Sequence, residues 1–191
     1  MSPRVVAVAV AIAAIAGGWW LAVRTRGTPS APAPAAAPAA ADPAAAARKI
    51  TATLYYVSDD GMALVGVQRE VPYGEGVLEQ ARQIVTAQLS AAPPPLVSAI
   101  PQGATLRALY LTDRGDAFVD LSAEARTMHS GGALDELFTV YSIVNALTTN
   151  LPAVARVQIL VDGKEVDTLA GHVDLRHPLQ KNMKWMRSDK G

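Results

Sequence analysis

Hydrophobic and polar positions follow two different periods along the part of the chain that begins near residue 48. Stretches rich in β-branched and aromatic residues, with alternating polarity, predict β-strands. Other stretches carry apolar residues three and four positions apart, and this spacing predicts amphipathic helices. The pattern predicts strands at 50–57, 63–71, 105–111, 117–121, 154–161 and 164–169, and helices at 75–91 and 133–149.

Residues that favour turns and helix ends separate these elements. The stretch 58–61 (SDDG) predicts a turn, and we expect an asymmetric or bulged hairpin there. The proline run 93–95 ends the first helix. Ser122 is expected to cap a short irregular helix. The pair Asp162-Gly163 is the strongest two-residue hairpin signal in the chain.

The order of the predicted elements is ββ-α-ββ-α-ββ. This order predicts an α+β fold in which two helices pack on one face of a mainly antiparallel sheet. The other face of that sheet is expected to be more polar, with Arg107 and Gln158 among its members. The second helix, at 133–149, has the wider apolar stripe, so we expect it to be the more deeply buried.

A long uncharged segment precedes the predicted domain. Residues 5–23 contain no charged side chain, and a helix of this length just spans a hydrocarbon core of roughly 30 Å. Trp19 and Trp20 lie near its end, where indole rings favour the membrane interface. We therefore predict that residues 1–26 form a transmembrane helix that precedes the folded domain. The alternative is a cleaved signal peptide, whose apolar region is usually shorter.

Residues 27–47 are dominated by alanine and proline. Prolines recur too often there to permit a helix, so an extended and disordered linker is expected. Fully extended, it would reach about 65 Å. We expect this linker to carry a domain at 48–178 away from the bilayer surface.

Composition narrows the chemistry available to that domain. From residue 48 onward the acidic side chains slightly outnumber the basic ones, which gives no overall electrostatic reason to bind nucleic acid. The chain contains no cysteine. Disulfides, cysteine nucleophiles, thiolate metal sites and a lipid-modified N-terminal cysteine are therefore excluded.

The segment 179–191 predicts a basic, flexible tail. Cations recur here and just before it, with apolar residues between them. Such a tail is typical of a solvated chain end. Alternatively, it binds an anionic surface such as lipid head groups, a wall polymer including peptidoglycan, or an acidic protein surface. The basic residues are Arg176, Lys181, Lys184, Arg187 and Lys190.

One short motif resembles a metal site. His172, Asp174 and His177 offer three side chains that bind divalent metals. The motif lacks a fourth ligand and does not have helical spacing, and short motifs of this kind occur by chance. We therefore favour a structural role for these residues, and predict no metal ligand and no cofactor. A metal-dependent enzyme that uses them remains as a further alternative.

Other candidate catalytic groups are weaker. Asp59 and Asp60 resemble a fragment of a calcium loop, but the rest of that pattern is missing. His129 and Ser130 are neighbours without a predicted nucleophile geometry. A carboxylate cluster around the predicted hairpin at 105–121 would need Asp113, Asp116 and Asp120 to converge. We predict that the protein has no catalytic residues and is not an enzyme.

The ordered set of segments resembles the GerMN domain, which is named for sporulation and spore germination proteins. The resemblance covers residues 50–178. It rests on LYYVSDDGMALVGVQREVP (54–72), AIPQGATLRALYLTDRGDAFVDLS (99–122), YSIVNALTTNLPAVARVQILVDGKEVDTLAGHVDL (141–175) and the proline at 178. Many family members are lipoproteins, and this chain departs from that pattern because it has no cysteine.

The resemblance implies a membrane-attached protein of the bacterial envelope with its domain outside the cytoplasm, on the periplasmic or cell-wall side. The charges that flank residues 5–23 do not decide the orientation by themselves. The resemblance also implies a non-catalytic scaffolding module. We expect such a module to bind an envelope protein through a sheet edge or the polar sheet face. A module that binds peptidoglycan or another wall polymer is the alternative.

Overall fold

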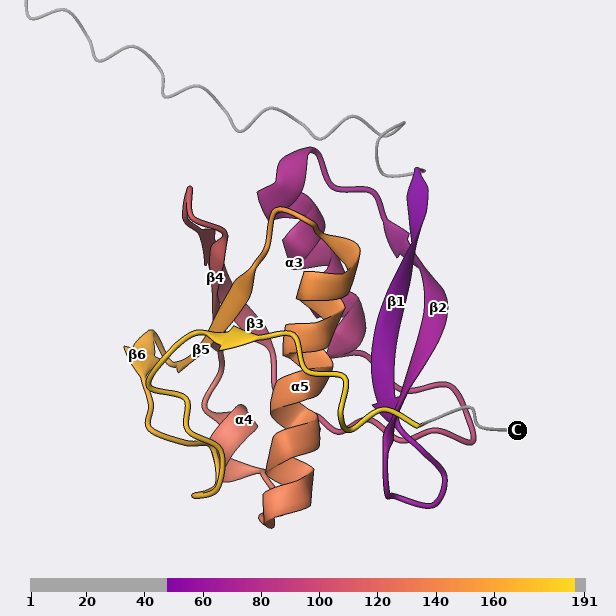
Figure 1. Ribbon diagram of the computed structural model, residues 1–191, viewed down its shortest axis with the longest axis vertical. Coiled ribbons are helices and arrows are strands. Elements are labelled where there is room, and N and C mark those ends of the chain that lie inside the picture. The colour runs from indigo at the N-terminus through magenta and orange to yellow at the C-terminus, as the bar shows by residue number, and fades with distance from the viewer. Residues whose placement is uncertain (1–47, 188–191) are drawn as a thin grey trace, which may run out of the picture. The chain divides into compact units, whose positions relative to one another are not determined.

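The computed structural model describes residues 48–187 (Figure 1). The predicted anchor at 1–26 and linker at 27–47 lie outside these residues. Within them, no helix is both long and apolar enough to cross a membrane. The helices and strands follow the predicted order, with small shifts at their ends. They are β1 (Lys49–Val57), β2 (Leu64–Pro72), α3 (Gly76–Gln88), β3 (Leu106–Leu111), β4 (Asp116–Leu121), α4 (Glu124–Thr127), α5 (Ala133–Asn150), β5 (Arg156–Val161), β6 (Lys164–Glu165) and β7 (Leu179–Gln180).

The strands form two sheets. β1 and β2 form an antiparallel two-stranded sheet, while the other strands form a five-stranded sheet with the order β3-β4-β5-β6. β7 pairs with β5 beside β6. β4 and β5 are parallel, because the crossover between them passes through α5. The fold is therefore α+β, with one antiparallel and one mixed sheet.

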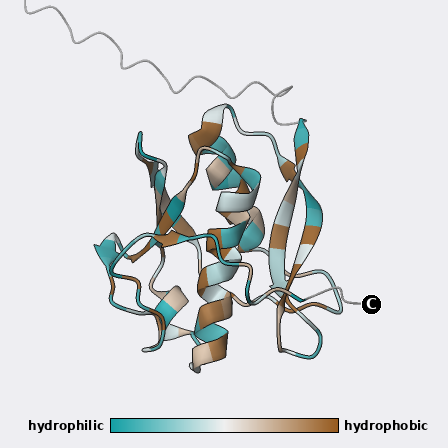
Figure 2. Ribbon diagram, viewed as in Figure 1, coloured by the Kyte–Doolittle hydropathy of each residue, from teal (hydrophilic) through white to brown (hydrophobic). Residues whose placement is uncertain are grey.

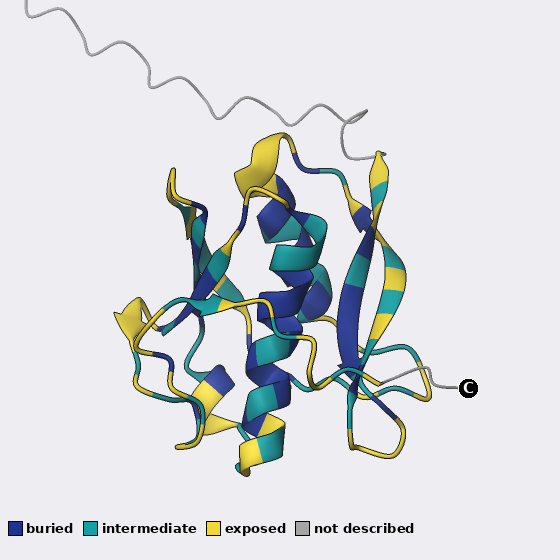
Figure 3. Ribbon diagram, viewed as in Figure 1, coloured by how far each residue is buried: buried dark blue, intermediate teal, exposed yellow. Residues whose placement is uncertain are grey.

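The helices lie between the two sheets (Figure 1). α5 contacts both β1 and β5, and α3 contacts β1, β2 and β3. The prediction of a single sheet covered on one face was therefore wrong. More than half of the residues of α5 are buried, and they include polar as well as apolar ones (Figure 3). These polar residues are Glu136, Thr139, Ser142 and Asn145.

Apolar side chains from the helices and from both sheets form one buried cluster. Figure 2 shows hydrophobic residues on the helices and on the strands of both sheets. Burial of this surface is the main force that holds the layers together. The largest fully buried side chains come from both sheets and from both long helices. They include Tyr55, Tyr56, Ile84, Leu109, Leu121, Phe138, Ile143, Leu147 and Ile159.

The turns differ from the predictions in detail. The pairing of β1 with β2 runs without a register shift, so the expected bulge is absent from this hairpin. Asp162 and Gly163 both have positive φ angles, as the predicted tight turn requires. The strand that follows them, β6, has only 2 residues, fewer than the predicted range 164–169. Ser122 does not cap a helix, because Ala123 is the N-cap of α4 and no side chain caps that helix. The Ser122 hydroxyl oxygen instead accepts a hydrogen bond from the backbone N–H of Thr105.

The two residues predicted on a polar sheet face have different surroundings. Arg107 is exposed and lies beside Asp120 and Asp162. Gln158 is buried, and its side-chain amide donates to the backbone carbonyl of Leu175. The segment between β6 and β7 folds back on this part of the sheet and covers Gln158. That face is therefore less polar and less open than predicted.

The C-terminal segment 179–187, named here the strap, is part of the fold. Its first residues form β7 on β5. The Asn145 side chain on α5 then forms two hydrogen bonds with the backbone of Asn182, at 2.8 and 2.9 Å. Met186 pairs in parallel with Leu64 at the start of β2. The prediction of a flexible tail was therefore wrong for residues 179–187, because backbone pairing and the Asn145 amide hold them.

Candidate functional site

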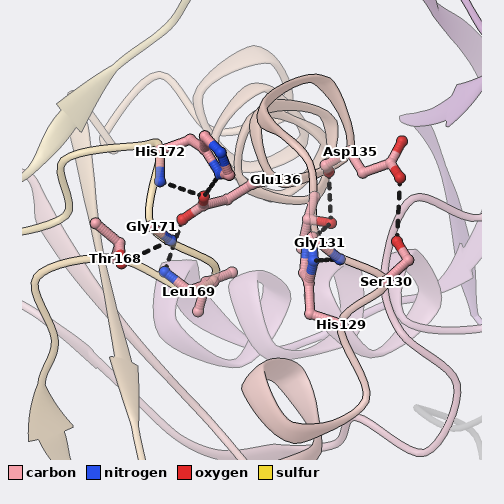
Figure 4. A network of polar contacts seen from close by, with 10 residues as sticks. His129, Ser130, Gly131, Asp135, Glu136, Thr168, Leu169, Gly171 and His172 are labelled. Atoms are coloured by element: carbon pink, nitrogen blue, oxygen red, sulfur yellow. Dashed lines mark hydrogen bonds and ion pairs between the residues drawn. The ribbon is translucent and has the colours of Figure 1, made fainter.

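A cluster of polar side chains lies around the first turn of α5 (Figure 4). Ser130 donates a hydrogen bond to the Asp135 carboxylate, with an Oγ–Oδ2 distance of 3.1 Å. The neighbouring His129 accepts a hydrogen bond at Nδ1 from the backbone N–H of Gly131, and its Nε2 lies 3.2 Å from Thr139 Oγ1. Both ring nitrogens of His129 therefore contact other groups, and neither contacts Ser130. The arrangement does not provide the hydroxyl-to-histidine contact that activates a serine nucleophile.

A groove of about 620 Å³ lies beside this cluster, between the segment 89–103 and the residues 128–130. Val97 and Met128 line it with exposed apolar side chains. The only titratable side chain among its lining residues is His129, whose ring is held as described. The groove therefore has shape and apolar surface, but lacks the pair of titratable groups that acid–base chemistry uses.

Glu136 is fully buried at the start of α5. Its carboxylate accepts hydrogen bonds of 2.7 Å from the backbone N–H groups of Leu169 and His172 (Figure 4). Burial raises the pKa of Glu136, but hydrogen bonds from the backbone of residues 169, 170, 172 and 173 outweigh it, so the pKa lies below its ordinary value. A charged carboxylate therefore fixes the loop between β6 and β7. This loop leaves no open position at Glu136 for a substrate.

Two residues of the predicted metal motif, His172 and Asp174, contact different side chains. His172 Nδ1 lies 3.3 Å from Glu136 Oε2. Asp174 forms a two-bond ion pair with Arg176, and the guanidinium holds the pKa of this carboxyl well below its usual range. Among residues 48–187, no three histidine, aspartate or glutamate side chains are placed to bind one metal ion. The geometry supports a structural role for His172 and Asp174.

The other candidate carboxylates are also held separately. Asp116 pairs with Arg156 on the adjacent strand, at 2.6 Å. Asp120, at the other half of β4, accepts a hydrogen bond from the N–H of Gly163 and lies 3.4 Å from Arg107. Each aspartate thus has its own cation or backbone donor, which is typical of structural ion pairs. Asp113 lies exposed in the turn between β3 and β4.

The acidic turn between β1 and β2 binds the strap. Arg187 lies 2.8 Å from the Asp59 carboxylate and 3.2 Å from the Asp60 carboxylate. Asp60 also accepts hydrogen bonds from Ser58 and from the N–H of Met62. Of the remaining cations in the predicted basic tail, Lys181 and Lys184 are exposed, while Lys190 lies outside the described residues.

Backbone groups on the outer edges of the first hairpin provide the clearest candidate for a binding site. Hydrogen bonds at both ends of the ladder, between Ser58 and Ala63 and between Tyr73 and Arg48, fix which residue pairs exchange bonds. In an antiparallel ladder bonded and non-bonded pairs alternate, so every second residue directs its N–H and C=O groups outward. On β1 these are the odd-numbered residues, and on β2 the even-numbered ones.

The outer edge of β1 is closed by other parts of the chain at three successive outward-facing residues, Thr53, Tyr55 and Val57, while Lys49 and Thr51 at its start are exposed. The backbone of Val97 forms two hydrogen bonds with Val57. The side-chain amide of Gln88 forms two with Tyr55, and the amide of Asn150 forms two with Thr53, all between 2.7 and 2.9 Å. Gln88 and Asn150 are the last residues of α3 and α5. Each amide therefore takes the place of a neighbouring strand's peptide group.

The outer edge of β2 is closed only at its two ends. At one end the strap forms hydrogen bonds of 2.8 Å with the N–H and C=O of Leu64. At the other end, the Gln80 side chain donates to the carbonyl oxygen of Pro72, at 3.2 Å. Between these points the outward-facing residues Gly66, Gln68 and Glu70 are exposed, and their backbone groups have no outward partner among residues 48–187.

The edges of the larger sheet are better covered. On β3, Arg82 donates to the carbonyl oxygen of Leu109, and α3 packs beside the strand. On the opposite side, β6 and β7 both pair with β5. The segment Gly66–Glu70, named here the open edge, contains three successive outward-facing residues whose backbone groups have no outward partner among residues 48–187. Natural proteins usually cover such an edge, so this segment is the candidate for a binding surface.

Comparison with known proteins identifies the fold and the family. A family model described as sporulation and spore germination matches residues 53–167, more than half of the chain. No curated protein matches the chain.

Three similar solved structures share the fold. The tandem GerMN domains of the sporulation protein GerM from Bacillus subtilis are 19% identical, with a TM-score of 0.59, over 70% of this chain and 46% of that one. The first GerMN domain of GerM alone is also 19% identical, with a TM-score of 0.54, over 69% of this chain and 97% of that one. A candidate lipoprotein from Clostridium perfringens is 25% identical, with a TM-score of 0.51, over 70% of this chain and 88% of that one. The chain belongs to the sporulation and spore germination family and contains a GerMN domain.

Proposed function

We propose that this protein is a non-catalytic interaction module of the bacterial cell envelope, and that it binds another envelope protein at the surface around the open edge. The observation that carries the proposal is the contrast between closed and open strand edges. Other parts of the chain cover the β1 edge at Thr53, Tyr55 and Val57, whereas Gly66, Gln68 and Glu70 are exposed and without outward partners among the described residues. A strand edge of this kind is a common surface for recognition between proteins.

The candidate catalytic groups support a module without an active site. Ser130 is bonded to Asp135, and both nitrogens of His129 are engaged elsewhere. The most deeply buried carboxylate, on Glu136, holds a loop. His129, Ser130 and Glu136 therefore serve as contacts within the fold.

The N-terminal sequence supports a location at the membrane. Residues 5–23 are long and apolar enough to form an anchor, and the linker 27–47 would separate it from the domain. The similar protein from Clostridium perfringens is described as a lipoprotein, which is consistent with attachment to an envelope membrane in this group of proteins. We propose that the domain lies outside the cytoplasm and that the linker gives it reach.

Photo-crosslinking in intact cells tests this proposal. A photoreactive amino acid is placed at Gln68 on the open edge, and in a matched protein at Gln102, which is also an exposed glutamine but lies in the loop before β3. We expect a defined protein adduct from position 68 and at least tenfold less of it from position 102. Absence of a protein adduct from position 68, or equal adducts from both positions, would contradict the proposal.

A further inference from the structure

The strap shows that the β2 edge accepts an added strand. Its residues 185–187 lie parallel to β2, with Leu64 donating to the carbonyl of Trp185 and accepting from the N–H of Arg187. Leu64 is the only outward-facing residue of β2 with which the strap pairs. The next three outward-facing residues, Gly66, Gln68 and Glu70, continue the same edge. An extended chain placed there would continue the pairing that the strap begins.

The backbone of the open edge offers a regular set of hydrogen-bonding groups. Gly66, Gln68 and Glu70 each direct one N–H and one C=O outward, as the alternation of the ladder requires. A strand of about five residues spans this distance at roughly 3.3 Å per residue. Pro72 ends the run, because it has no N–H and its carbonyl oxygen already accepts from Gln80.

The side chains of β2 indicate what the added strand should carry. Val65 and Val67 are half-buried and flank Gly66. A Cβ atom at Gly66 would lie 3.1 Å from the Thr53 methyl group and 3.3 Å from the Tyr55 ring, so these two side chains line the face of the sheet at that point. The edge is therefore apolar on both faces around Gly66.

The other half of the open edge is polar. Gln68 and Glu70 are exposed, and Glu70 pairs with Lys49 at 2.9 Å. The hydrogen bond and the charge of Lys49 keep the pKa of Glu70 below its ordinary value, so its carboxylate is ionised at neutral pH. This half matches polar or basic side chains of a neighbouring strand.

We propose that the open edge binds an extended segment of a partner protein by strand addition. The segment carries β-branched or aromatic side chains opposite Val65, Gly66 and Val67, followed by polar or basic ones opposite Gln68 and Glu70. It lacks proline at its hydrogen-bonding positions. This inference rests on the proposed function, since it specifies how the partner is held.

A proline substitution separates backbone pairing from other kinds of contact. The N–H of Gln68 points away from β1, so Gln68→Pro removes a donor from the open edge and leaves the β1–β2 ladder bonds in place. Gln68→Ala is the matched control, because it removes the side chain and keeps the N–H. Both variants are made in the full-length chain with the photoreactive amino acid at Glu70, and their adducts in intact cells are compared.

We expect Gln68→Ala to keep the partner adduct within about threefold of the parent, and Gln68→Pro to reduce it at least tenfold. Equal adducts from both variants would overturn strand addition and leave the proposed function standing. Loss from both variants would show that the glutamine side chain, and not the backbone, makes the contact, and would also overturn it. An adduct with a second copy of this chain would overturn the choice of a partner protein. No protein adduct in the parent would remove both proposals.

Folding of the variants is checked by thermal unfolding of the purified full-length proteins. If Gln68→Pro does not fold, Glu70→Pro replaces it, because the N–H of Glu70 also points outward. The photoreactive amino acid then moves to position 68, and Glu70→Ala becomes the control. The same four outcomes apply to this second pair.

Discussion

β1 and β2 belong to one ladder, but their outer edges differ. Three successive outward-facing residues of β1, namely Thr53, Tyr55 and Val57, each exchange two hydrogen bonds with another part of the chain. On β2 the outward-facing run Gly66–Glu70 is exposed and unpaired among the described residues. The difference follows from position, because β1 lies against both long helices, and its edge is buried at Tyr55. A buried backbone group without a partner is costly, whereas an exposed one bonds to water.

The largest expected effect comes from opening the closed edge. Gln88 is fully buried, and its amide holds both backbone groups of Tyr55. Gln88→Leu keeps most of the volume but leaves these two groups without partners. Each unsatisfied buried group costs about 1–3 kcal/mol, so we expect the free energy of unfolding to fall by about 3 kcal/mol. Chemical denaturation of the full-length protein measures this. A loss below about 1 kcal/mol would show that water replaces the amide.

A smaller, pH-dependent effect is expected at Glu136. Here a charged carboxylate accepts the backbone hydrogen bonds, whereas at Gln88 a neutral amide forms them. Glu136→Gln should lower the free energy of unfolding by about 2 kcal/mol at pH 7, because hydrogen bonds to a charged acceptor are the stronger kind. The pKa of Glu136 is lower in the folded protein than its ordinary value of 4.5. Its stabilising contribution is therefore complete above that value and is lost as the pH falls through the folded pKa.

Denaturation of the parent and of Glu136→Gln between pH 7 and pH 3 tests this. The difference in unfolding free energy between the two proteins should be constant near neutral pH and should shrink in acid. Gln88→Leu, in contrast, should differ from the parent by the same amount across this range, because an amide does not titrate. A difference at Glu136 that grows in acid would contradict the assigned direction of its pKa.

The smallest effect is expected on the open edge. The Gln68 side chain is exposed and makes no hydrogen bond within the described residues. Gln68→Ala should change the free energy of unfolding by less than about 0.5 kcal/mol, as is usual for exposed positions without special contacts. Thermal unfolding of this variant beside Gln88→Leu compares the two edges directly. A loss of more than 1 kcal/mol from Gln68→Ala would indicate that part of the chain covers the open edge.

Local patterns predicted most of the elements but not their assembly. Period and turn residues located both long helices and five of the strands within a few residues. They did not indicate two sheets, because the same hairpin pattern fits one sheet or two. The wide apolar stripe of α5 predicted deep burial, but the polar residues that face its other surroundings, such as Glu136 and Asn145, resembled solvent-facing positions.

The candidate site was predicted only in kind. A strand edge was expected to bind a partner, but which edge is available depends on the edges that other residues cover. Gln88 and Asn150 look like ordinary polar residues at helix ends, and their role depends on contacts 33 and 97 residues away in the chain. The strap was missed because its basic composition resembled a solvated tail, while its pairing depends on Asn145 and Leu64.

The long sequence separation of the amide contacts also has a consequence for biogenesis. The first hairpin is local and can form as soon as residue 72 has been made. The outer edge of β1 stays uncovered at Thr53 until Asn150, at the end of α5, has been made. Contacts of such separation form late in folding. Until then both edges of the hairpin carry unpaired backbone groups that can pair with other chains, so a chain that lacks α5 is expected to aggregate more readily than the complete chain.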